Sequence, residues 1–214
     1  MSQKLLQAVA HNTRFRLVNL LKRTQGLSVQ EIADRLDMSY MGVKESCQDL
    51  ERRGLVDTRR EPKPDGTTGR PRLVYRLTSR AHELFPVASN PLTLELLEAA
   101  KKLHGPAAPE KLLLLVWQQK FASLAERMKG ESLAERVASL AKLRDDEGHM
   151  AVVEEDGDLR IVEHHCPFLD LLRTFPILIK LESDLFSRIL GVPVRREENC
   201  AGGLLRVEYI LHKG

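Results

Sequence analysis

Hydrophobic spacing divides the beginning of the chain into short helices. From Asn12, apolar residues recur every three or four positions until Gly26, which is placed to end a first helix. A second helix follows at Ser28, because a serine there can accept a hydrogen bond from a free backbone N–H while Glu31 reaches back, as in a capping box. Its buried face is predicted to continue through Ile32, Ala33 and Leu36.

A third helix is predicted from Ser39 to Arg53, with Gly54 just beyond its end. Its apolar stripe contains Val43, Cys47 and Leu50, so we expect Cys47 in the core rather than at a ligand site. The opposite face of this helix is expected to be solvent-exposed and contains Ser39, Tyr40, Met41, Gly42, Lys44, Glu45 and Gln48.

Two alternating segments after the third helix predict a β-hairpin. They span residues 55–60 and 72–77, and the turn signal Pro64-Asp65-Gly66 lies between them. Leu73, Tyr75 and Leu77 are expected on the buried face, and they alternate with Arg72, Val74 and Arg76. Three helices followed by a basic hairpin are typical of the winged helix-turn-helix fold.

The middle of the chain is predicted to be almost entirely helical. Residues 91–105 and 109–130 carry two helices, and Ser132 with Glu135 forms a second capping box that opens a third. Trp117 and Phe121, four positions apart, are expected in the core. A long apolar helix next to a winged-helix domain is commonly a dimer contact, so we expect a homodimer.

From His149 the pattern changes to strands. A first hairpin turns at Asp156-Gly157, helical residues 168–190 are broken at Pro176, and a second hairpin covers residues 192–211 with its turn near Gly202-Gly203. The apolar face of the last strand contains Leu205, Val207, Tyr209 and Leu211. The fold class is therefore α+β, with a winged helix at 1–85, a helical linker and dimerisation region at 86–146, and a small sensor-like domain at 147–214.

The composition is that of an ordinary globular protein. Of 214 residues, 43% are hydrophobic and 29% are charged. The longest apolar run, Leu112–Trp117, is far shorter than the roughly 18 residues that cross a membrane, and no signal-peptide core is present. Three cysteines without disulfide spacing, Cys47, Cys166 and Cys200, fit a reducing compartment, so we expect a cytoplasmic protein with no membrane partner.

Positive charge is concentrated near the N-terminus. Residues 1–80 contain 16 basic and 9 acidic residues, whereas the remainder contains 17 basic and 21 acidic residues. This asymmetry indicates a module that binds a polyanion, although a basic surface that only confers solubility is an alternative.

Double-stranded DNA is the polyanion that such a fold would bind. A helix fits the major groove and reads base edges, while the hairpin and neighbouring arginines contact phosphates. Gly42 costs this helix about 1 kcal/mol relative to alanine, which close approach to DNA or internal packing could explain. Docking to another protein is an alternative role for the fold. The candidate DNA contacts are Ser39, Tyr40, Gly42, Lys44, Gln48, Arg59, Arg60, Lys63, Arg70 and Arg72.

The stretch SVQEIADRLDMSYMGVKESCQDLERRGLV resembles the ArsR/MarR-like winged-helix regulators of bacteria. The resemblance covers residues 12–80 and rests on the serine that opens the third helix and on the leucine-rich end leading into "GLV". It implies a transcriptional regulator, and the two-fold symmetry common among such regulators implies that a homodimer reads an inverted repeat.

The stretch HHCPFLD, which begins at His164, is the strongest candidate for metal chemistry. With the segments around it, it resembles the C-terminal domain of the SufR-like iron-sulfur biogenesis repressors, in which an Asn/His-Cys-Pro follows the first hairpin. The resemblance implies further cysteine ligands, but Ile179 and Val207 stand where they are expected. The remaining candidate metal ligands are Cys166, Cys200, His164 and His165.

Three interpretations of these four residues remain open. Two thiolates with one histidine could hold zinc or a [2Fe–2S] cluster. Only one of His164 and His165 should then face the site, because adjacent strand residues point to opposite faces. Alternatively, Cys166 is a small buried residue beside half-exposed histidines, or the residues line a pocket for a small organic effector.

Two other functions compete with a sensing regulator. The first is a DNA-binding or architectural protein that needs no ligand. The second is an enzyme that pairs Cys166 with His164 or His165, but nucleophilic catalysis needs a base held in reach and oriented by a third group, and no nucleophile motif surrounds this cysteine. We therefore do not expect an enzyme.

Overall fold

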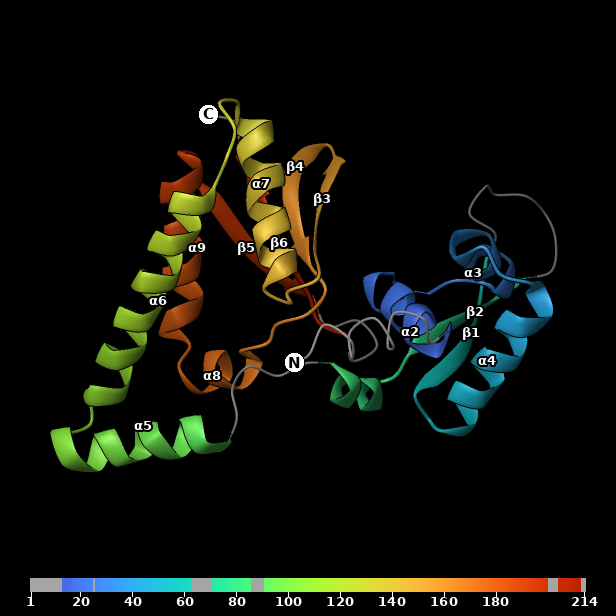
Figure 1. Cartoon of the computed structure of the whole chain (residues 1–214), viewed down its shortest axis with the longest axis horizontal. Coiled ribbons are helices and arrows are strands. Elements are labelled where there is room, and N and C mark those ends of the chain that lie inside the picture. The colour runs from blue at the N-terminus through green and yellow to red at the C-terminus, as the bar shows by residue number, and fades with distance from the viewer. Residues whose placement is uncertain (1–12, 25, 63–70, 86–90, 200–203, 213–214) are drawn as a thin grey trace. The chain divides into compact units, whose positions relative to one another are not determined.

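The computed structural model describes residues 13–24, 26–62, 71–85, 91–199 and 204–212 (Figure 1). These residues form two compact units, one within residues 1–85 and one within residues 86–199 and 205–214. We call them unit 1 and unit 2. None of the helices in the described ranges is both long and apolar enough to span a membrane.

Among its described residues, unit 1 contains three α-helices, a hairpin and a short 3₁₀ helix. Local sequence signals set the helix ends: the hydroxyl of Ser28 and the carboxylate of Glu31 form the predicted capping box, and Asp37, with φ of 53°, ends the same helix in a left-handed conformation. In chain order the elements are α2 (Thr13–Arg23), α3 (Val29–Leu36), α4 (Tyr40–Arg52), β1 (Val56–Glu61), β2 (Arg72–Leu77) and η1 (Ser79–Leu84).

The hairpin is tied to the helices by a connection that the sequence pattern did not predict. Leu27, between α2 and α3, exchanges two backbone hydrogen bonds with Tyr75 of β2, at N···O distances of 3.1 and 2.8 Å. Gly26 makes this approach possible, because its φ is +146° and a methyl group on it would lie 2.8 Å from Cγ of Arg76. The strand pair is thereby anchored beside the α2–α3 turn.

The same approach overturns the predicted alternation along β2. Val74, expected to face outward, is fully buried, whereas Leu73, expected in the core, is 45% exposed. Val74 lies against Gly26, so both faces of the strand are covered at this point. Leu73 pairs with Arg60 near the end of the hairpin where β1 and β2 are connected.

Unit 2 combines a four-stranded antiparallel sheet, in the order β3-β4-β6-β5, with five helices among its described residues. Helices α8 and α9 are separated at Pro176, as predicted, and Gly157 turns the first hairpin with φ of +83°. The elements are α5 (Pro91–His104), α6 (Ala108–Arg127), α7 (Leu133–Asp146), β3 (Ala151–Asp156), β4 (Asp158–Glu163), α8 (Leu169–Thr174), α9 (Ile177–Leu190), β5 (Val194–Asn199) and β6 (Arg206–Leu211).

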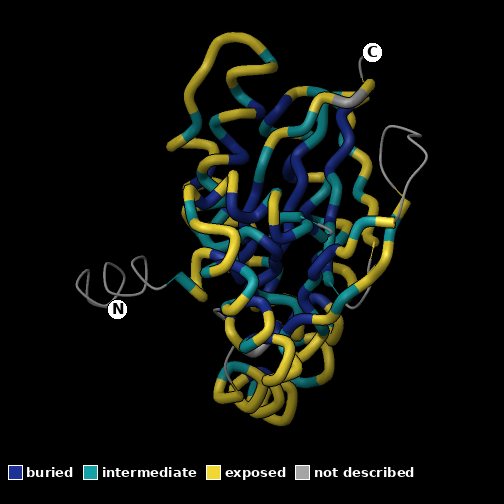
Figure 2. Tube along the Cα trace, turned by 90° about the vertical axis from the view of Figure 1, so that its right-hand side faces the viewer, coloured by how far each residue is buried: buried dark blue, intermediate teal, exposed yellow. Residues whose placement is uncertain are grey.

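Helices and sheet of unit 2 share one hydrophobic core, which corrects the predicted boundary at residue 146. Helix α7 packs on β3 and β4, while α9 packs on both α6 and β5 (Figure 1). Trp117 and Phe121 of α6 belong to the same buried cluster as Val207 and Tyr209 of β6. The helices expected to form a separate linker therefore bury their apolar faces against the strands that follow them, and the buried positions of β4 and β6 are among those drawn dark blue in Figure 2.

Candidate functional site

Helix α4 presents a polar face because its opposite face is fixed in the core of unit 1. Val43, Cys47 and Leu50 are buried, and α4 packs against α3. The first turn is capped by Ser39, whose Oγ accepts a hydrogen bond from the backbone N–H of Gly42 at 3.2 Å. The buried stripe and the cap together determine which side chains of α4 reach solvent.

The outward residues predicted from the sequence are all accessible on this helix. Tyr40 and Gln48 are exposed, and Lys44 is half-buried between them. Tyr40, Lys44 and Gln48 are four positions apart, so their side chains form one stripe along the helix. This stripe combines an aromatic hydroxyl, an ammonium group and an amide, which can contact phosphates, guanine and adenine respectively.

Gly42 has an internal reason to be a glycine. A Cβ atom built on it would lie 3.1 Å from Oγ of Ser39, which is tighter than ordinary van der Waals contact. The same Oγ accepts the cap hydrogen bond, so it has little freedom to move away. Crowding at the cap therefore accounts for part of the helix-propensity cost of this glycine.

The hairpin contributes Arg59 and Arg60 to the candidate interface. Arg59 and Arg60 of β1 are exposed, and neither forms an ion pair with any residue that the structure describes. Adjacent strand residues point to opposite faces, so the two guanidinium groups lie on both sides of the ribbon. Lys63 and Arg70, together with the predicted turn between the strands, lie outside the described residues.

Arg72 differs from the other hairpin residues that were predicted to contact DNA, because its side chain already forms ion pairs within unit 1. Its Nη1 donates to Oε1 of Glu31 at 2.7 Å, and its Nη2 lies 3.4 Å from Oε2 of Glu61. Glu31 is also the capping-box residue of α3, and hydrogen bonds from Ser28 and the charge of Arg72 outweigh burial to lower its pKa. Arg72 thus links the hairpin to the start of α3.

The candidate metal ligands of unit 2 follow β4 rather than lie within it. The backbone N–H of His165 donates to the carbonyl of His149 at 3.0 Å, and that of His164 donates to Met150 at 3.4 Å. Both imidazole side chains are buried, which corrects the expectation of half-exposed histidines, and the strand alternation assumed for them does not apply beyond Glu163.

Cys166 is a buried thiol in this arrangement. Burial, followed by the charges of Glu182 and Glu163, raises its pKa to about 12. A thiol with this pKa is protonated at neutral pH and is a poor nucleophile. Within the described ranges no three His, Cys, Asp or Glu residues are grouped as metal ligands; Cys200 lies outside those ranges.

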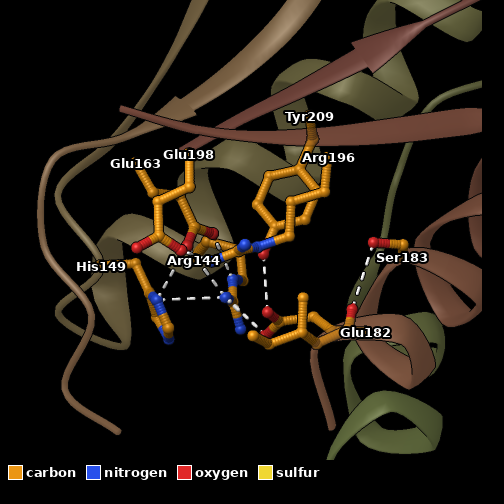
Figure 3. Close-up of polar contacts among 9 residues, drawn as sticks. Arg144, His149, Glu163, Glu182, Ser183, Arg196, Glu198 and Tyr209 are labelled. Atoms are coloured by element: carbon orange, nitrogen blue, oxygen red, sulfur yellow. Dashed lines mark hydrogen bonds and ion pairs between the residues drawn. The ribbon is translucent and has the colours of Figure 1, made fainter. Parts of the chain in front are cut away.

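A buried polar cluster lies next to these residues, and sequence reasoning missed it. It joins α7, the turn after α7, β4, α9 and β6 through the side chains of Arg144, His149, Glu163, Glu182 and Tyr209 (Figure 3). Nε of Arg144 donates to Oε1 of Glu163 at 2.6 Å, and its Nη2 lies 2.9 Å from Oε1 of Glu182. The hydroxyl of Tyr209 donates to the other oxygen of Glu182 at 2.6 Å.

The proton positions in this cluster follow from counting donors. Nη2 of Arg144 carries two protons, and Oε2 of Glu163 and Oε1 of Glu182 accept them. Nδ1 of His149, 3.0 Å from Oε2 of Glu163, is therefore assigned as a donor to that carboxylate. Burial alone would raise the pKa of Glu163, but the charges of Arg144 and His149 and their hydrogen bonds lower it to about 2.

The sequence does contain a signal for this cluster. Arg144 continues the buried stripe of α7 that includes Val137, Leu140 and Ala141, and Glu182 lies on the buried stripe of α9 between Leu178 and Leu185. A charged residue at a core position of an amphipathic helix requires a buried partner, because an unpaired buried charge is strongly destabilising. The pattern predicts that partners exist but not which residues they are.

Comparison with known proteins finds one similarity, which lies within unit 1. Residues 11–66 match the MarR family, and the match includes α2, α3, α4 and β1. No curated protein and no solved structure matches the chain. The match supports an N-terminal winged-helix domain of the kind found in transcriptional regulators. The ArsR-like subtype and the SufR-like resemblance of the C-terminal region stay predictions.

Proposed function

We propose that this protein is a transcriptional regulator that binds double-stranded DNA as a homodimer and reads an inverted repeat. The observation that carries the proposal is the stripe of Tyr40, Lys44 and Gln48 on the exposed side of α4, whose other side is locked in the core. A rigid helix with outward polar side chains meets the geometric requirement for reading base edges in the major groove.

The electrostatics of the hairpin support the same proposal. Arg59 and Arg60 hold exposed positive charges that the described part of unit 1 does not neutralise. Phosphate contacts by such groups position a protein on duplex DNA and make its affinity depend on salt. A helix that reads bases and a hairpin that holds the backbone have complementary roles, so each can be tested separately.

Substitution of the helix residues tests base reading directly. An operator would first be selected from a random duplex library with the full-length protein, and its affinity measured by fluorescence anisotropy. We expect Q48A and K44A to weaken binding to the selected duplex by roughly 5- to 150-fold, corresponding to about 1–3 kcal/mol per base contact. A K142A variant, at an exposed position of α7 in unit 2, is the matched control.

The comparison of specific with non-specific DNA decides the result. Loss of a base contact reduces affinity for the selected duplex but leaves affinity for a scrambled duplex nearly unchanged. Equal affinity of the wild type for both duplexes at physiological salt, unaffected by Q48A and K44A, would show an architectural DNA-binding protein instead.

A further inference from the structure

Helix α5 carries an apolar stripe that faces solvent. Leu92, Leu96 and Leu103 are 58%, 61% and 77% exposed, and Ala99 is exposed as well. Leu97 is on the other side of the helix and belongs to the core of unit 2. In Figure 2, α5, at the bottom of the view, is yellow over most of its length. We call Leu92, Leu96, Ala99 and Leu103 the α5 seam.

The spacing of the α5 seam is that of a coiled-coil interface. Its members are separated by four, three and four residues, which is the alternation of a and d positions in a heptad. Exposed apolar stripes of this kind mark interaction surfaces, because single scattered apolar residues show no such periodicity. The seam therefore fits another helix with the same periodicity.

We propose that a second copy of this chain covers the seam, with the two α5 helices antiparallel about a two-fold axis between Leu97 and Glu98. This inference deepens the proposed function and rests on it, since it identifies the surface that forms the homodimer. The axis places Leu92 opposite the partner's Leu103 and Leu96 opposite the partner's Ala99. A large residue thus faces a small one at the centre, and leucines meet at both ends.

Charges beside the seam are complementary only in the antiparallel arrangement. Glu95 and Lys102 occupy equivalent positions seven residues apart on the same flank of the seam. Antiparallel pairing brings Glu95 next to the partner's Lys102, and the two-fold axis repeats this pair. Parallel pairing about a two-fold axis along the helices would bring like charges to the same level.

Ion pairs among the described residues do not involve Glu95 or Lys102, so both can form ion pairs with a partner subunit. In the described residues, the carboxylate of Glu98 pairs with the ammonium group of Lys101 on the same helix at 3.6 Å, whereas neither Glu95 nor Lys102 has an ion pair. Glu98 and Lys101 lie away from the seam and provide matched controls for charge reversal.

Helix α6, against which α5 packs, also carries exposed apolar residues. Leu112, Leu115 and Val116 are exposed on one side of α6, away from the buried stripe that contains Leu113 and Trp117. A stable protein interface buries about 800 Å² on each partner, which is more than one short helix seam supplies. We therefore include these three residues in the dimer interface.

A single charged residue in the seam should dissociate the dimer. The full-length L96E variant would be compared with wild type by sedimentation equilibrium without DNA, and we expect its dimer dissociation constant to rise at least 100-fold. L94E is the matched control, because Leu94 is an exposed leucine on the opposite side of the same helix, and we expect it to remain dimeric. A dimeric L96E protein would overturn the proposal.

Mixed charge variants test the antiparallel direction without disturbing the apolar contacts. E95K alone and K102E alone place like charges together in each homodimer, so both should dimerise at least 10-fold more weakly than wild type. Mixing E95K with K102E restores both opposite-charge pairs, and we expect heterodimers to predominate in native mass spectrometry. E98K and K101E should dimerise like wild type. A random mixture of E95K and K102E dimers would overturn the antiparallel arrangement.

Measuring DNA binding separately distinguishes failure of this inference from failure of the proposed function. If L96E remains dimeric but the wild type still prefers its selected duplex and loses that preference on Q48A substitution, only the α5 interface is wrong. If L96E is monomeric but no variant or duplex shows sequence preference, the interface stands and base reading is wrong. Circular dichroism melting verifies that each variant is folded.

Discussion

Arg144 and Glu163 form a two-point ion pair in the interior of unit 2. The guanidinium Nε lies 2.6 Å from Oε1, and Nη2 lies 3.0 Å from Oε2, and both side chains are at most 4% exposed (Figure 3). Glu182 binds the same guanidinium from α9, so one positive charge lies between two carboxylates contributed by different elements. The pair joins α7 to the end of β4.

This pair predicts a specific loss of stability in acid. The pKa of Glu163 is lowered to about 2 in the folded protein from an ordinary value of about 4.5. A lowered carboxylate pKa stabilises the folded state above pH 4.5, and this contribution is lost as the pH falls from 4.5 towards 2. The complete loss amounts to about 3 kcal/mol, of which about 2 kcal/mol falls between pH 6 and pH 3, where denaturant unfolding measures it.

Glu163→Gln isolates this contribution from those of other carboxylates. We expect the variant to be less stable than wild type at pH 7 by about 3 kcal/mol, because it leaves Arg144 incompletely paired in the core, and to approach wild type as the pH falls. Exposed Glu155→Gln is the control, which should follow the wild-type curve. A stability difference between E163Q and wild type that stays constant from pH 6 to pH 3 contradicts this role of Glu163.

The salt dependence of DNA binding should distinguish Arg59 and Arg60, which make no ion pair among the described residues, from Arg72, which is paired. Each lost phosphate contact reduces the slope of log K against log[salt] by about 0.9. We expect R59A/R60A to reduce the slope by about 2, whereas R72A should change it by less than 0.5, because Arg72 is paired with Glu31 and Glu61. Anisotropy titrations at several salt concentrations measure these slopes.

Thermal unfolding provides the complementary measurement for these variants. R72A should lower the melting temperature, since it removes the link between the hairpin and the capping box of α3. R59A/R60A should leave the melting temperature unchanged, because both side chains are exposed and make no ion pair among the described residues. The opposite assignment, with Arg72 carrying the larger slope change, would return Arg72 to the DNA-contacting set.

Local signals predicted most helix and strand positions in this chain. Both capping boxes form as expected, at Ser28 with Glu31 and at Ser132 with Glu135, and α4 begins directly after Ser39. These signals act within one helical turn, so they operate whatever the rest of the fold does. The exposed stripe on α4 could be predicted for the same reason, because helical periodicity alone assigns its two faces.

Features that depend on contacts distant in sequence could not be predicted. Val74 is buried because Gly26, which is distant from it in the sequence, lies against it. Glu163 is buried beside Arg144 because β4 ends next to α7. Likewise, alternation fails at His164 and His165, since the chain leaves the strand at Glu163. Periodicity gives the faces of an element but not the element that covers each face.

The thiol of Cys166 should react very slowly in the folded protein. A pKa of about 12 leaves roughly one thiol in ten thousand as the reactive thiolate at pH 8, about a thousand-fold fewer than for an ordinary cysteine. Iodoacetamide labelling followed by peptide mass spectrometry measures this rate, with the protein in guanidinium chloride as the reference. Because nucleophilic catalysis requires the thiolate, fast labelling of folded Cys166 would favour the enzyme hypothesis.

Gly42→Ala tests whether the glycine of α4 serves the helix cap or the bound DNA. Alanine gains about 1 kcal/mol of helix propensity, but its Cβ would lie 3.1 Å from Oγ of Ser39 and weaken a cap that contributes about 1 kcal/mol. We expect these effects to cancel, so that G42A unfolds within about 0.5 kcal/mol of wild type in urea.

Ser39→Ala makes the two effects separable. In the S39A background the cap hydroxyl is absent, so G42A should there stabilise the protein by about 1 kcal/mol. If the glycine serves only the cap, G42A leaves DNA affinity unchanged. A tenfold loss of affinity for the selected duplex at unchanged stability shows instead that DNA approaches the backbone at this position, because a methyl group there obstructs the duplex without affecting the fold.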